Sequence, residues 1–158
     1  MKFVIVKKVD GNYKDIMRQF DRKLFEALKP SIGEMEVVAF TGSKKGDQVH
    51  VRFHSPIKAE WISDITEHGE NETEAFFIDE GVKLPFPFSY WQHKHIVQKI
   101  TDNTSYIIDD ITFKGPNFII SWCLYPAIYL GFYPRKSIYK KYFKAKISPS
   151  PKTPPNGH

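Results

Sequence analysis

The amino-acid sequence predicts an α+β fold in which a curved antiparallel seven-stranded sheet wraps around a long C-terminal helix, with a helical segment after the first strand. Three observations predict this fold. A short Val- and Ile-rich segment opens the chain, and a helical pattern follows it. Six strand-like segments joined by short turns then form an antiparallel meander. A long apolar segment near the end can cover one face of that sheet.

The first strand is expected at residues 2–9, at an edge of the sheet or closing it. The turn Asp10-Gly11-Asn12 leads into one helix, because apolar side chains recur at helical spacing between Tyr13 and Leu28. Pro30 is expected to end this helix, since proline lacks the amide hydrogen that the next turn would use.

From Glu34 to Lys114 the apolar pattern has a period of two, which is typical of strands. Turn-forming residues separate the segments, so neighbouring segments are expected to pair as hairpins. The predicted hairpins join residues 35–41 with 48–54 through 43–47, residues 57–67 with 72–82 around 69–71, and residues 88–100 with 105–113 at 102–103.

A helical region is expected after Gly115-Pro116, which ends the sheet. Residues 118–133 carry no charge, but they fall short of the roughly 20 residues that a membrane-spanning helix needs. Pro126 and Gly131 are expected to interrupt them. Residues 135–146 return to a helical period, with lysines on one face. We expect a long, bent helix that lies against the sheet along most of its length.

The composition fits one soluble domain. Of the 158 residues, 41% are hydrophobic and 26% are charged, which excludes coiled-coil, collagen-like and wholly disordered chains. We expect a single domain over residues 1–146 and a Pro-rich tail over residues 147–158. Cys123 is the only cysteine, so no internal disulfide can form. The apolar run within residues 1–10 is too short for a signal peptide, and a cytoplasmic location is therefore expected.

The formal net charge of +5 arises mainly from basic residues near the C-terminus. A helix with such residues usually presents a solvated face. Its aromatic residues fall on the opposite face, so nucleic acid is not an expected partner. The sequence also lacks the phosphate-binding glycine motifs and the Gly-x-Ser-x-Gly motif, which removes support for nucleotide-dependent enzymes and serine hydrolases.

Polar side chains are expected on the inner face of the third hairpin. In residues 105–113 the face that holds Asp109 is otherwise apolar. It meets the histidine face of residues 88–100 if the turn has three residues or the strand a bulge. A plain two-residue turn opposes His95 to Asp110 instead, and the sequence leaves both registers open. The two faces consist of Trp91, His93 and His95 in one strand and Ile107, Asp109, Ile111 and Phe113 in the other.

Two imidazoles and a carboxylate among apolar residues can serve four purposes. A His–Asp pair can act as a general base. His93 and His95 with Asp109 could hold a metal ion. The three could form hydrogen bonds with the polar group of an apolar ligand, or form a satisfied structural network. We expect no metal and no cofactor, and we name these three residues only as candidates for catalysis.

Aromatic residues make up 15% of the chain, so some are expected to line a ligand site in addition to the core. Tyr125 and Tyr129 lie one helical turn apart and combine a ring with a hydroxyl. Phe86 and Phe88, in a stretch with two prolines (Leu84-Pro85-Phe86-Pro87-Phe88), either close a cavity mouth or belong to a plain connection. Trp61 and Trp122 fit a cavity wall or ordinary core. The predicted ligand-binding residues are Trp61, Trp91, His93, His95, Asp109, Ile111, Phe113, Trp122, Tyr125 and Tyr129.

The order of elements resembles the helix-grip fold of the START/SRPBCC superfamily, which includes birch-pollen-allergen-like proteins and polyketide cyclases. FPFSYWQHKHIVQKI followed by IIDDITFKGPN is similar to a bacterial branch of ligand-binding SRPBCC proteins, in which W-x-H-x-H precedes D-x-I-x-[YF]. The end of the terminal helix, PRKSIYKKYF, is similar as well. The resemblance implies a curved sheet with a pocket beneath the last helix, and no particular reaction. The matching residues are Trp91, His93, His95, Asp109, Ile111 and Phe113.

The preferred hypothesis is therefore binding of a hydrophobic or amphipathic, lipid-like small molecule between the sheet and the C-terminal helix. One alternative is an enzyme of the polyketide cyclase or dehydratase kind that uses a His/Asp acid–base pair. A second alternative is contact with an anionic membrane surface through residues 118–133 and the basic helix that follows.

Overall fold

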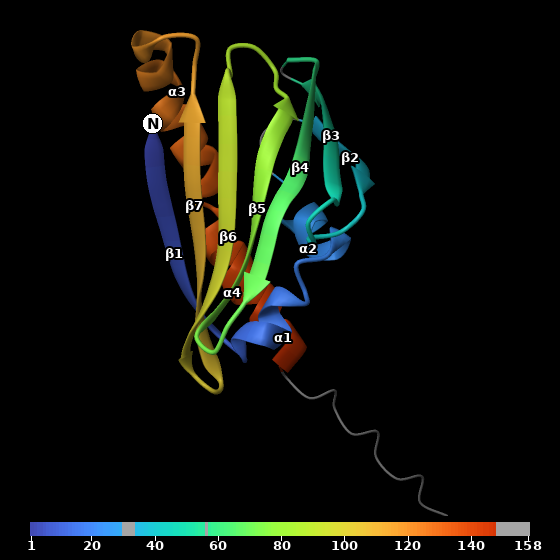
Figure 1. Ribbon diagram of the computed structural model, residues 1–158, viewed down its shortest axis with the longest axis vertical. Helices are drawn as coiled ribbons and strands as arrows, with labels where there is room; N and C mark the ends of the chain where they lie inside the picture. Colours follow the sequence, from blue (N-terminus) through green and yellow to red (C-terminus); the bar gives the residue numbers. More distant parts are fainter. Residues whose placement is uncertain (30–33, 56, 148–158) are drawn as a thin grey trace, which may run out of the picture.

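The computed structural model of the chain describes residues 1–29, 34–55 and 57–147. Its centre is one antiparallel sheet with the strand order β1-β7-β6-β5-β4-β3-β2 (Figure 1). The predicted seven-stranded sheet is confirmed, and the first strand lies at an edge, where it pairs with β7. The strands are β1 (Lys2–Asp10), β2 (Glu34–Phe40), β3 (Gln48–Ser55), β4 (Ala59–Glu70), β5 (Glu74–Lys83), β6 (Tyr90–Thr101) and β7 (Thr104–Lys114).

The helical segment after β1 consists of two short helices, not the single helix that the sequence predicts. They are α1 (Tyr13–Met17) and α2 (Arg22–Ala27). The second helix starts afresh because the Asp21 side chain accepts a hydrogen bond from the Leu24 amide at 2.9 Å, which satisfies one of its free N–H groups. Most apolar side chains of this segment lie in the core, as their spacing predicts, whereas Phe25 of α2 is only half-buried. The predicted stop at Pro30 lies outside the described residues.

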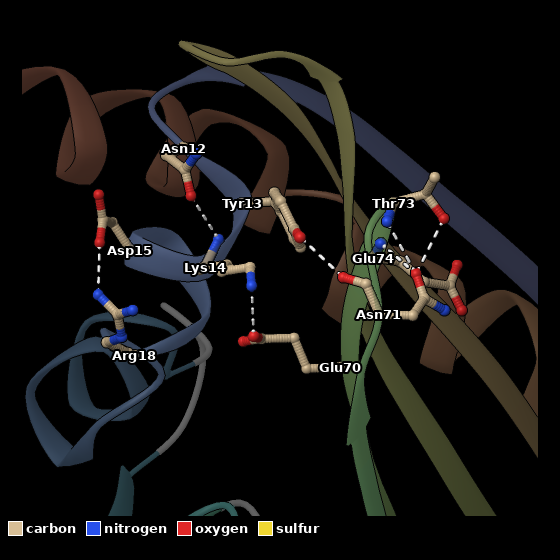
Figure 2. A network of polar contacts seen from close by, with 9 residues as sticks. All are labelled: Asn12, Tyr13, Lys14, Asp15, Arg18, Glu70, Asn71, Thr73 and Glu74. Carbon is tan, nitrogen blue, oxygen red and sulfur yellow. Dashed lines mark hydrogen bonds and ion pairs between the residues drawn. The ribbon is translucent and has the colours of Figure 1, made fainter.

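Helix α1 is tied to the turn between β4 and β5 (Figure 2). The Tyr13 hydroxyl donates a hydrogen bond to the Asn71 carbonyl at 2.7 Å, and Lys14 pairs with Glu70 at 2.7 Å. The Asn71 side chain also accepts hydrogen bonds from Thr73 in the turn and from Glu74, the first residue of β5, so it shapes the turn itself. These contacts hold the start of α1 against one end of the sheet.

The C-terminal helix is bent, as predicted. It comprises α3 (Phe118–Phe132) and α4 (Arg135–Ile147), and both lie behind the sheet in Figure 1. The expected interruption at Pro126 and Gly131 is wrong, because α3 continues through both residues. The helix breaks instead at Pro134, which restricts the residue before it and lacks an amide hydrogen. Ile147 ends α4, and the rest of the predicted tail lies outside the described residues.

The two halves of this helix meet the sheet differently. Helix α4 buries Tyr139 and Phe143 completely or almost so. Helix α3 is apolar all round, and its outer face is exposed: Phe118 is 72% accessible, Trp122 58% and Leu130 66%. The opposite face of α3 packs against the sheet, with Tyr125, Tyr129 and Phe132 in contact with Phe3, so the helix lies against the sheet as expected and only its outer face is exposed. Within the described residues, no helix is long and apolar enough to cross a membrane.

The interior divides into two apolar clusters. One lies between the sheet, α1, α2 and α4, and contains Phe20, Leu24 and Tyr139. The other lies between β1, β6, β7 and α3, and contains Phe3 and Trp91. The polar face of the third hairpin lies along the same strands as these clusters, so its charged groups are surrounded by apolar side chains.

Candidate functional site

A cavity of about 240 Å³ lies between the sheet and the helices. Residues of β2 to β6 line one side, and residues of α2, α3 and the start of α4 line the other. Most of the lining is apolar, with Phe25, Val51 and Phe132 as examples. Its polar side chains are few, and three of them lie together on β5 and β6. The polar lining residues are Ser63, Asp79, His93, His95 and Arg135.

The histidines meet Asp109 because β6 and β7 pair through a bulge. The turn between the strands has two residues, and such a turn alone would oppose His95 to Asp110. The register shifts by one residue between Lys99 and Thr101, so His95 pairs with Asp109. The bulge therefore decides the register that the sequence leaves open, and it brings the two polar faces together.

Two carboxylates hold the two imidazoles between them. The ring centroids of His93 and His95 lie 3.6 Å apart. On one side, Asp109 Oδ1 is 3.0 Å from His93 Nε2 and 3.3 Å from His95 Nδ1. On the other side, Asp79 Oδ2 is 3.6 Å from His93 Nδ1 and 3.4 Å from His95 Nε2. All four ring nitrogens thus face a carboxylate oxygen.

Asp79 is the residue of this cluster that the sequence-based hypothesis missed. It lies on β5, opposite His93 in the strand pairing, and shares its strand face with the buried Ala75 and Phe77. Trp91 Nε1 donates a hydrogen bond to Asp79 Oδ1 at 3.0 Å, which fixes the carboxylate and leaves Oδ2 toward the imidazoles. The sequence did contain a signal for Asp79, because a single carboxylate on an otherwise apolar strand face is unusual and needs a partner.

The electrostatics of the cluster favour one charged and one neutral imidazole. Burial opposes protonation of His95, but Asp109 and Asp79 outweigh it and raise its pKa. Burial, and next the neighbouring His95, lower the pKa of His93 to about 4. Burial acts against the charged forms of Asp79 and Asp109 as well, yet the histidines keep the pKa of both carboxyls below the ordinary value.

Asp109 is the innermost member of the cluster, with no accessible surface. The Tyr139 hydroxyl donates a hydrogen bond to its Oδ1 at 3.2 Å. Burial and the Asp109 charge raise the pKa of Tyr139 well above the ordinary value, so this hydroxyl stays protonated. Asp109 Oδ2 and His95 Nδ1 make no hydrogen bond. The network is thus incomplete, although most buried polar groups in proteins have a partner.

The structure brings some of the predicted site residues to the cavity and keeps others away. Trp61, Trp91, His93 and His95 line it, and Asp109 lies behind the histidines. Ile111 and Phe113 are fully buried in the second cluster and do not line the cavity. Tyr125 and Tyr129 pack against Phe3 in that cluster, and Trp122 lies on the exposed face of α3. Phe86 is exposed in the connection between β5 and β6, and Phe88 packs against Trp61 and Trp91.

Comparisons with known proteins identify the fold. No protein-family model and no curated protein sequence matches the chain. Among solved structures, the Zhui aromatase/cyclase of a Streptomyces species is similar, with a TM-score of 0.69, 7% identity, and coverage of 94% of this chain and 96% of that one. A norcoclaurine synthase variant of Thalictrum flavum, solved with a transition-state analogue, has a TM-score of 0.65, 14% identity, and coverage of 94% and 98%.

A protein of Staphylococcus epidermidis, solved by NMR, is similar as well, with a TM-score of 0.63, 14% identity, and coverage of 94% of this chain and 93% of that one. These identities are low, so the likeness shows the fold alone. The chain shares with these structures a curved antiparallel sheet and a bent C-terminal helix, which is the helix-grip fold that the sequence resemblance implies.

Proposed function

We propose that this protein binds a small apolar or amphipathic molecule in the cavity between its sheet and its C-terminal helix. The observation that carries the proposal is a cavity of about 240 Å³ whose lining is mostly apolar and whose polar groups are clustered. Ligand sites in proteins combine these two features, with volumes of roughly 300–1,000 Å³. The volume here is slightly smaller, so it favours a compact aromatic or short-chain ligand.

The polar cluster would orient this ligand. Asp79, His93 and His95 line the cavity and can hydrogen-bond to a hydroxyl or carbonyl group, while burial of the apolar part supplies most of the affinity. Asp109 contributes indirectly, because it holds the imidazoles from behind. Arg135, which also lines the cavity, favours a ligand with a partly negative polar group.

Thermal unfolding with a panel of small aromatic, polyketide-like, sterol and short-chain lipid molecules tests the proposal. A ligand at 100 times its dissociation constant adds about 2.7 kcal/mol, which raises the melting temperature of a domain of this size by roughly 5–10 °C. Failure of every compound to stabilise the protein would contradict the proposal.

A variant that fills the cavity provides the matched control. Gly131 lines the cavity, and a Cβ atom there meets nothing within 4 Å. Gly131→Phe should therefore keep the fold and abolish the thermal shift. Leu130→Phe, one position away on the exposed face, should leave the shift unchanged. Equal stabilisation of Gly131→Phe and the wild type would show that the ligand binds elsewhere.

A second candidate function is proton transfer beside a carbonyl group, as in a cyclase or dehydratase. The favouring observation is that the His95 ring lines the cavity and lies between two carboxylates, an arrangement that can orient a general base. Each ligand found by thermal shift can be incubated with the protein and examined for products by mass spectrometry. Turnover that His95→Gln abolishes at unchanged stability supports this function, and an unchanged rate in that variant contradicts it.

A further inference from the structure

We infer that Asp79, His93 and His95 form a site for one divalent transition-metal ion, with zinc as the ion that suits these donors best. The inference does not depend on the proposed small-molecule ligand. The sequence-based hypothesis considered Asp109 as the carboxylate ligand and expected no metal. In the structure Asp79 occupies that place, and Asp109 lies on the opposite side of the imidazoles.

The donor atoms converge as metal ligands do. Asp79 Oδ2, one nitrogen of His93 and one nitrogen of His95 all lie within 4.8 Å of one another. The two nitrogens are 3.6 Å and 3.4 Å from Asp79 Oδ2. Two atoms bound to the same zinc ion at 2.0–2.1 Å in tetrahedral geometry lie about 3.4 Å apart. Each carboxylate–imidazole pair is thus within a few tenths of an ångström of the spacing that a shared ion requires, and the two imidazole nitrogens, at most 4.8 Å apart, would close to a similar spacing when the ion binds.

The surroundings hold these donors in the orientation that a metal needs. The other ring nitrogen of each histidine faces Asp109 Oδ1: His93 Nε2 is hydrogen-bonded to it at 3.0 Å, and His95 Nδ1 lies 3.3 Å away without a hydrogen bond. A carboxylate behind a metal-bound histidine accepts its N–H, and so directs the lone pair of the opposite nitrogen to the metal. Trp91 binds the spare oxygen of Asp79 in the same way.

This tautomer arrangement requires a cation. If both N–H groups face Asp109, then two nitrogen lone pairs face Asp79 Oδ2, and three acceptors would oppose one another in a buried site. Either a proton or a metal ion can occupy the space among them. A dication also balances the two carboxylates, since both imidazoles are then neutral.

The donor set selects the kind of metal. Two imidazoles with one carboxylate suit zinc and other first-row transition metals, whereas magnesium and calcium prefer oxygen ligands only. Three protein ligands leave a fourth position free, and the three residues line the cavity, so this position faces the space proposed for the small molecule.

To test the inference, the full chain is treated with a chelator to remove any bound metal and is then titrated with a metal ion. We expect calorimetry to show one Zn²⁺ per chain, and Co²⁺ to give the visible absorption of a tetrahedral site. Asp79→Asn, which retains an acceptor for Trp91, should weaken binding more than tenfold, and Asp109→Asn should weaken it about 10- to 100-fold. Circular dichroism checks that each variant is folded.

Two surface variants serve as controls. His54 pairs with Glu36 on the surface and could bind zinc weakly, so His54→Gln should leave the tight site unchanged. Asp64→Asn removes an exposed carboxylate that binds Gln48 and should also have no effect. The inference is overturned if the folded wild type takes up no stoichiometric zinc, or if Asp79→Asn binds as tightly as the wild type. If Asp79→Asn does not fold, NMR of the histidine ring nitrogens in the wild type replaces this variant. The inference is overturned if the addition of Zn²⁺ shifts only the signals of the exposed histidines.

Discussion

At the scale of single residues, Asp109 is the contact point of two histidines and a tyrosine. Because its second oxygen already lacks a hydrogen bond, loss of the Tyr139 hydroxyl leaves the buried charge less well compensated. We expect Tyr139→Phe to lower the free energy of unfolding by about 1–3 kcal/mol, measured by urea denaturation. Tyr106→Phe, on an exposed tyrosine, should change it little. Equal effects of the two variants would contradict a role for this hydrogen bond.

The lowered pKa of His93 predicts a loss of stability in acid. In the metal-free protein this pKa is about 4, and an unfolded histidine titrates near 6.5. The unfolded chain therefore binds a proton in this window that the folded chain does not, so the free energy of unfolding falls as the pH drops from 6.5 to 4. We expect His93→Gln to flatten this slope in urea denaturation with a chelator present.

The neighbouring groups contribute outside this window. Because the pKa values of Asp79 and Asp109 are lowered, these carboxylates add to the free energy of unfolding at neutral pH, and this contribution is lost only below about pH 4. The raised pKa of His95 makes its contribution complete below pH 6.5 and lost as the pH rises above that value. His54→Gln, at an exposed position, should keep the wild-type slope. A wild-type stability that does not change between pH 6.5 and 4 would contradict the prediction.

The sequence could identify the inner face of β6 but not its whole environment. Alternation predicted that Trp91, His93 and His95 share a face, and they do. It could not reveal Asp79, because strand order and register decide which distant residue lies opposite a histidine. It also could not choose between Asp109 and Asp110, since that choice rests on a bulge.

At the scale of elements, a glycine near the end of α3 lowers the stability of the helix but leaves open space beside the cavity. Gly131 has a helical backbone, and an added Cβ atom meets no neighbour. We expect Gly131→Ala to raise the free energy of unfolding by about 0.4–1 kcal/mol, because alanine restricts the unfolded chain. Chemical denaturation measures the change.

A second glycine should respond in the opposite direction. At Gly69 in β4, an added Cβ atom would lie 2.8 Å from the Phe76 ring, so Gly69→Ala should destabilise the protein. Stabilisation by both alanine variants, or by neither, would show that local space does not decide the outcome.

The helices show where pattern-based prediction ends. The apolar spacing from Tyr13 to Leu28 predicted the buried face correctly, but a capping aspartate splits the segment into two helices. In α3 every side is apolar, so no periodicity indicates which side packs and which is exposed. Only the tertiary structure shows that Trp122 and Leu130 face outward.

At the scale of the whole molecule, the exposed apolar face of α3 directly precedes a helix rich in lysine. This combination suits the surface of an anionic membrane, which was the second alternative from the sequence. We expect the protein to sediment with vesicles that contain phosphatidylserine at low salt, and less so at high salt. Trp122→Glu should reduce the bound fraction.

Val82→Glu supplies the control for this prediction. Val82 is an exposed apolar residue on β5, away from α3 in the sequence, so its replacement should not alter vesicle binding. Binding that is equal for neutral and anionic vesicles, or unaffected by Trp122→Glu, would contradict the prediction.

The bulge in β6 has a consequence for how the chain can vary in length. Ile100 is the surplus residue: Lys99 pairs with Ser105 and Thr101 with Thr104. Removing Ile100 would leave an uninterrupted hydrogen-bonded ladder and would keep the pairing of His95 with Asp109. The end of the hairpin can therefore shorten by one residue without changing which residues pair in the interior. Conversely, straightening the bulge at full length would turn the apolar face of β7 outward. The apolar inner face of β7 therefore stabilises the strand register that keeps Asp109 buried.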